Sequence, residues 1–224
     1  MDPYPMDEKG VVRPLKLLRE LKDPTHVLLS IGGNDAREAF VSSFNIDNIY
    51  KTMVDRGIIE RFERLVTEIQ SVVPNVILVI VYHPQITSCP FLYMLPNAAT
   101  ITELIVKFSP MFFNIARKFK VPVIDLARTF NPYDSSDYGS SPIEPSNTSG
   151  IMIAELARHI IHHFEFGKEE AKVYTGLVGK ASGYRALKVE ALDDSWEGLT
   201  KYRASLQKHL ADGRQNAPSS CVIS

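Results

Sequence analysis

Four residues that could form part of a binding or catalytic site follow one apolar stretch. They are Gly32, Gly33, Asn34 and Asp35, directly after the run 28–31 (LLSI). Two successive glycines let a backbone pass close to a ligand, and the Asn34 amide can donate a hydrogen bond to it. A donor fixed at the carboxyl end of a strand suits the oxyanion that forms in acyl transfer. An ordinary turn, with Asp35 as the N-cap of the next helix, explains the same residues. On these four residues alone, the turn is the simpler interpretation.

His83 is a second candidate, because it follows another apolar run, 76–82 (VILVIVY). We assign it to substrate binding, with plain polar surface as the alternative. Three histidines near residue 160 fit a solvated helix end, and His162 and His163 lack the i, i+4 spacing of a metal pair. With only two cysteines in the chain, no thiolate metal site can be built. We therefore predict no metal and no cofactor.

Three apolar runs are predicted to be the strands that position these residues: 25–31, 76–82 and 121–126. Their cores are apolar on successive residues, which is typical of parallel strands buried on both faces. Helical periodicity surrounds and separates them, with Gly57 as a candidate break and Pro110 expected to kink or split its helix. The periodic segments are 12–22, 46–73, 98–119 and 149–164. This alternation predicts an α/β layer fold with a parallel sheet. Ligands in such folds bind beyond the carboxyl ends of the strands, so the loops 32–37, 83–97 and 126–149 should open on one side.

Composition divides the chain further. After residue 164 it becomes more charged, and its strongest pattern is a helix near 193–212. The expected segments are a polar leader (1–11), an α/β domain (12–164), a partly helical extension (165–212) and a flexible tail (213–224).

Two stretches, THVLLSIGGNDA and VPVIDLARTFNPYDSSDYGSSPIEPSNTSGIMIAELARHI, resemble the third and last conserved blocks of the SGNH (GDSL-type) hydrolases. The resemblance extends over about 12–164. It implies a three-layer α/β/α sandwich of the flavodoxin-like type that hydrolyses esters. It also implies a serine nucleophile, a histidine base and an asparagine in the oxyanion hole, and Asn34 occupies the position of that asparagine.

The chain departs from this family in two places. No G-D-S nucleophile motif occurs, and the glycine block of the oxyanion hole is missing, so the domain is expected to be incomplete at its N-terminal side. The usual D-x-x-H-P reads S-P-I-E-P at 141–145, which puts Glu144 where the base histidine should be. A carboxylate near its ordinary pKa of about 4.3 is a poor base for a serine hydroxyl unless burial raises that pKa.

As the first strand of this chain, 25–31 is expected at the sheet edge, where an apolar strand is an aggregation hazard. Three explanations stay open: an incomplete gene product, a partner that covers the 25–31 edge, or cover by residues 1–24. The incomplete product is favoured over an evolved binding domain.

The net charge and the two ends of the chain limit which binding partners and cellular locations are expected. With 25 basic and 26 acidic residues, no field favours nucleic acid, and we predict no such partner. The sequence shows no signal peptide and no apolar stretch long enough for a membrane span, so a cytoplasmic location is expected. The ending Cys221-Val222-Ile223-Ser224 fits a C-a-a-X signal for farnesylation of Cys221, with a chance match as the alternative. One farnesyl group would give weak, reversible membrane association.

The function expected from these features is hydrolysis of a small-molecule ester, provided that a G-D-S segment is encoded upstream. The alternative is a non-catalytic binding or scaffold protein on the same fold, a pseudoenzyme tethered to membranes by prenylation.

Overall fold

The computed structural model describes residues 13–30, 32–33, 35, 45–86, 98–141, 143–178 and 185–215. Its strands are β1 (His26–Ser30), β2 (Asn75–Ile80), β3 (Val123–Asp125), β4 (Lys172–Val178) and β5 (Arg185–Ala191). Its α-helices are α1 (Arg13–Glu20), α3 (Ile46–Asp55), α4 (Ile58–Gln70), α5 (Ala98–Phe119), α6 (Asn147–His163) and α7 (Trp196–Gln215). Two short 3-10 helices, η2 (Leu126–Arg128) and η3 (Ser135–Asp137), lie between β3 and α6.

The strands form one sheet in the order β1-β2-β3-β4-β5. β1 to β4 are parallel, with Leu29 opposite Leu78 and Val79 opposite Ile124. β5 returns antiparallel to β4. The predicted α/β class with a largely parallel sheet is therefore confirmed.

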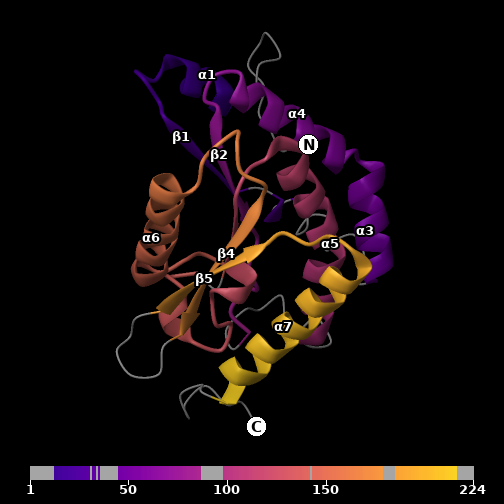
Figure 1. The fold of residues 1–224 in the computed structure, drawn as a ribbon. Helices are drawn as coiled ribbons and strands as arrows, with labels where there is room; N and C mark the ends of the chain where they lie inside the picture. Colours follow the sequence, from indigo (N-terminus) through magenta and orange to yellow (C-terminus); the bar gives the residue numbers. More distant parts are fainter. Residues whose placement is uncertain are drawn as a thin grey trace.

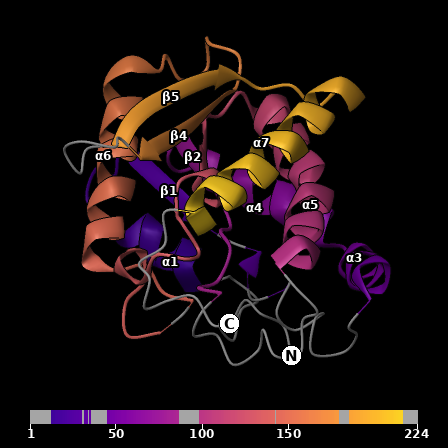
Figure 2. The same cartoon turned by 90° about the horizontal axis from the view of Figure 1, so that it is seen from below.

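Helices cover both faces of the sheet (Figures 1 and 2). The face that carries Val76 and Leu78 of β2 packs against α1, α3, α4, α5 and α7. Among the described α-helices, α6 packs against the other face, which carries Ile77 and Val79. Burial on both faces is confirmed for β2 and β3, because alternate side chains of these inner strands enter the two cores.

β1 lies at the edge of the sheet, as expected, and within the described residues no strand pairs with its free side. The prediction that this strand is buried on both faces is wrong. Leu29 is buried, but Leu28 is 44% exposed and Ser30 is exposed as well. The described side chains of the core around α6 come from β2, β3 and β4 among the strands, and β1 contributes none of them.

The segment 165–212 differs most from its prediction as a partly helical extension. It contributes β4 and β5 to the sheet, and β4 is hydrogen-bonded to β3. α7 then crosses back onto α5, where the rings of Tyr202 and Phe113 lie 5.4 Å apart (Figure 2). The helix continues to Gln215, inside the segment expected to be a flexible tail.

The two predicted helix breaks have different outcomes. Gly57 divides 46–73 into α3 and α4 and has φ +66°, a conformation that residues with a side chain rarely adopt. Pro110 does not divide α5, which continues through it.

Leu206→Ala should destabilise the whole protein, since the Leu206 side chain of α7 is fully buried in the main core. A loss of about 2–5 kcal/mol in the free energy of unfolding is expected, measured by urea denaturation. Trp196→Ala, at a position of the same helix that is 84% exposed, is the control and should change stability little. Equal effects of the two substitutions would contradict the integration of α7 into the fold.

Candidate functional site

Gly32 and Gly33 lie at the carboxyl end of β1, as predicted. Gly32 is buried with φ +99°, and a Cβ atom there would lie 3.3 Å from Cζ of Phe112 in α5. A Cβ on Gly33 would lie 3.7 Å from Cγ1 of Val81, just beyond β2. This backbone therefore passes close to both neighbours, and at Gly32 only glycine avoids strain. Asn34 lies outside the described residues, so its role as an oxyanion donor stays a prediction.

Asp35 fixes the same loop to α4. Its carboxylate accepts a hydrogen bond from Nη2 of Arg61 at 3.0 Å, and both side chains are largely buried. Gly33 and Asp35 are both helical, so the prediction that Asp35 is the N-cap of the next helix is wrong, because that helix has already begun by Gly33.

His83 follows β2 but points into the interior. Its side chain is 1% exposed, and Nε2 lies 3.3 Å from the hydroxyl of Thr102 in α5. Burial lowers the pKa of His83 to about 3, with a smaller contribution from nearby His209, and the backbone of Ala127 only partly opposes this. The imidazole is therefore neutral near pH 7 and is packed against α5 instead of facing solvent.

Glu144 belongs to a tight turn between η3 and α6. The amide of Gly139 donates to the Glu144 carbonyl at 2.9 Å, and the Glu144 amide donates to the Ser141 carbonyl at 3.1 Å. The Tyr82 hydroxyl donates to the carbonyl of Ile143 at 2.7 Å, which joins this turn to the end of β2. The Glu144 side chain is exposed. Its negative charge adds to the effect of burial in raising the pKa of Tyr82 to about 12.

The loops after β1, β2 and β3 thus meet at one edge of the sheet, through Gly33 beside Val81 and Tyr82 beside Ile143. The predicted side chains occupy different surroundings there. His83 is enclosed between α5 and the β3 loop, whereas Glu144 is open to solvent. Among the described residues no group of three or more His, Cys, Asp or Glu side chains is arranged to hold a metal ion.

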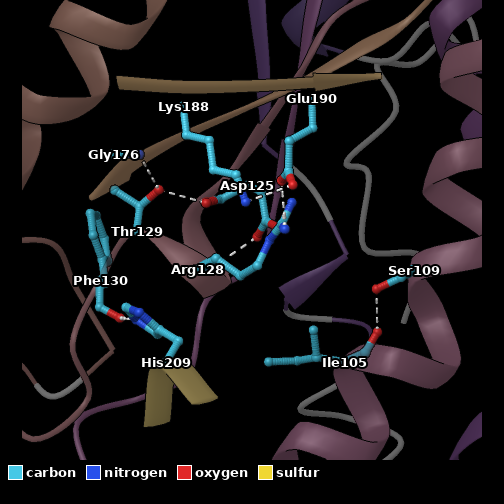
Figure 3. Close-up of polar contacts among 10 residues, drawn as sticks. All are labelled: Ile105, Ser109, Asp125, Arg128, Thr129, Phe130, Gly176, Lys188, Glu190 and His209. Carbon is cyan, nitrogen blue, oxygen red and sulfur yellow. Dashed lines mark hydrogen bonds and ion pairs between the residues drawn. The ribbon is translucent and has the colours of Figure 1, made fainter. Parts of the chain in front are cut away.

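A buried charged network at the end of β3 was missed by sequence reasoning (Figure 3). Asp125 is fully buried and accepts from Nε of Arg128 at 2.6 Å. Nη1 of Arg128 donates to Glu190 of β5 at 2.7 Å, and the guanidinium stacks over the ring of Tyr202 at 4.9 Å. The only sequence signal is the i, i+3 spacing of Asp125 and Arg128 immediately after a strand.

The charges of this network stabilise one another. Burial alone would lower the pKa of Arg128, but the carboxylates of Asp125 and Glu190 raise it above its ordinary value. Burial also tends to raise the pKa of Glu190, yet Lys188 and Arg128 lower it overall. Since every charge has a partner, the network is suited to fixing loops and not to proton transfer.

Further hydrogen bonds extend the network to β4 and α7 (Figure 3). The Thr129 hydroxyl donates to the Asp125 carbonyl at 2.6 Å and accepts from the Gly176 amide at 3.2 Å. Nε2 of His209 lies 2.7 Å from the carbonyl oxygen of Phe130. Contacts with β4 and α7 thereby hold the start of the loop that carries Glu144.

Comparison with known protein families, curated proteins and solved structures found no significant match. In the part of the chain that the structure describes, no helix combines the length and the apolar character needed to cross a membrane. Cys221 lies outside the described residues.

His83→Gln should make the free energy of unfolding depend less on pH in the acid range. The pKa of His83 is about 3 in the folded chain against an ordinary 6.5. Below about pH 6.5 only the unfolded chain takes up this proton, so stability falls with pH until the folded pKa is reached. His83 contributes at most about 1.4 kcal/mol per pH unit to the slope of the free energy of unfolding against pH. Urea unfolding at a series of pH values measures this slope.

Leu206→Ala serves as the control for this measurement, because it lowers stability at every pH and should retain the wild-type slope. Parallel pH curves for wild type and His83→Gln would contradict the burial of a neutral imidazole.

Proposed function

We propose that the chain contains part of an ester-hydrolase domain of the SGNH type, in which the Asn34 amide donates to the oxyanion. The observation that carries the proposal is Gly32. Its left-handed backbone at the carboxyl end of β1 lies close to Phe112 and turns the chain two residues before Asn34. Hydrolysis of a small-molecule ester is the reaction that such a donor serves.

The order of the elements also supports this proposal. β1, β2 and β3 are parallel neighbours in chain order, and α6 follows the loop after β3, which is the arrangement that the resemblance implies for 12–164. Among the described strands, none pairs with the free side of β1. A strand that ends in a G-D-S serine is the part of the family pattern that this chain does not contain.

The other residues take supporting roles in this proposal. Gly32 and Gly33 shape the oxyanion hole. His83 is buried beside Thr102, and its carbonyl accepts from the Tyr138 hydroxyl at 2.7 Å, so it holds the loops together instead of binding substrate. Glu144 holds the position of the base and is presented at the same edge by its turn. Its side chain is exposed to solvent.

A second candidate is a non-catalytic binding or scaffold protein on this fold. The observation in its favour is the free edge of β1, where Leu28 is 44% exposed and the strand HVLLS has no Lys, Arg, Asp, Glu or Pro to discourage pairing. A partner strand at this edge and a farnesyl group on Cys221 would together place such a protein at a membrane surface.

The two candidates are separated by the coding sequence upstream of Met1 and by an ester assay. A chain extended by a native G-D-S segment is expected to hydrolyse short-chain nitrophenyl esters, and the 224-residue chain alone is not. In the extended chain, Asn34→Ala should lower kcat by about 10²–10³, because the transition state loses one donor. Asn48→Ala, at an exposed position of α3, is the matched control.

Turnover that survives Asn34→Ala would overturn the assignment of the oxyanion donor. Absence of an upstream G-D-S segment, together with no turnover, would favour the scaffold.

Prenylation is tested by mass spectrometry of the chain expressed in eukaryotic cells. The expected result is a farnesyl thioether on Cys221 with loss of the last three residues, abolished by Cys221→Ser. An unmodified, full-length carboxyl terminus would refute it.

A further inference from the structure

Three histidines lie in the last two turns of α6, away from the loops of the candidate site. His159 and His163 are four residues apart, so they share one face of the helix, and their ring centroids are 4.5 Å apart. His162 points elsewhere, with its ring 6.5 Å from that of His163. His159 and His163 have the i, i+4 spacing of a metal-binding pair, which the adjacent residues His162 and His163 lack.

The ring separation fits a shared metal ion. An imidazole nitrogen binds a transition metal at about 2.0–2.1 Å, and a ring centroid lies roughly 1 Å further away. Two imidazoles that bind one metal at an angle near 90° therefore have centroids roughly 4.5 Å apart. The ring centroids of His159 and His163 have this separation.

The surroundings of the pair also favour a cation with nitrogen ligands. His163 is the last residue of α6, and the carboxyl end of a helix carries partial negative charge. The ring of Tyr174 from β4 lies 6.1 Å from that of His159 and limits its movement on the sheet side. His163 is exposed, so an ion can reach the pair from solvent.

We propose that His159 and His163 form a two-imidazole chelate for a late first-row divalent metal ion, Cu²⁺, Ni²⁺ or Zn²⁺, on the surface of α6. Imidazole is a preferred ligand of these metals, and Cu²⁺ should bind most tightly. The protein supplies two ligands, and water or an external group fills the remaining positions. The site is independent of the proposed ester hydrolysis, because α6 presents it on the helix surface and not at the carboxyl edge of the sheet.

Copper binding to the untagged, full-length chain tests this proposal. Titration calorimetry with Cu²⁺ alone, and electron paramagnetic resonance of the complex, are compared for wild type, His159→Ala, His163→Ala and His162→Ala. Loss of even an outer-shell partner weakens metal sites about 10–100-fold, so loss of either proposed ligand should weaken binding by at least roughly tenfold. His162→Ala should bind like the wild type.

The spectra provide a readout that a structural effect would not change. The wild type and His162→Ala should show two imidazole nitrogens coordinated to Cu²⁺, and His159→Ala and His163→Ala should show one. Equal affinity in all four proteins, or coordination in the wild type by one imidazole or by sulfur, would overturn the chelate.

Discussion

The buried guanidinium of Arg128 is the constraint around which the carboxyl edge of the sheet is organised. A charge at that depth is tolerated only when it is paired, because an uncompensated buried ion costs several kcal/mol. Asp125 supplies one partner from the end of β3 and Glu190 supplies another from β5, while Tyr202 of α7 offers its ring. One side chain therefore determines the positions of two strands and a helix, and through η2 it sets where the following loop begins.

The loop after η2 links this ion pair to the candidate site. Behind Arg128, Thr129 bonds to the backbone of β4, and the chain then passes the buried Asp137, which accepts from the Asn131 amide at 2.7 Å. Tyr138 and Tyr82 attach the loop to the residues after β2. The turn at Glu144 is thus held by a continuous series of hydrogen bonds that begins at a buried ion pair. A site whose loops are fixed in this way needs no large rearrangement to present its edge to a ligand.

Sequence reasoning found the elements whose pattern is local. β2 and β3 were predictable because their apolar residues are consecutive, and Gly57 was predictable because a glycine interrupts helical periodicity. β4 and β5 were missed because Lys188 and Glu190 make β5 look like solvated chain, although they belong to an edge strand that pairs through its backbone. The interior position of His83 and the partners of Arg128 depend on contacts with α5 and β5, which no local pattern contains. At the candidate site, Gly32 and Gly33 were located correctly, and Asn34 stays a prediction.

The pairing of Arg128 with Glu190 also bears on the order of events during synthesis. The ribosome delivers β3 and Asp125 well before β5 and α7, so Arg128 emerges with only one of its two carboxylate partners. During that interval β3 has no neighbour on the side that β4 later occupies. β3 is therefore an unpaired edge until β4 is translated, and β5 then takes the edge position. Protection by chaperones during this stage of translation would favour correct closure of the sheet over pairing between neighbouring nascent chains.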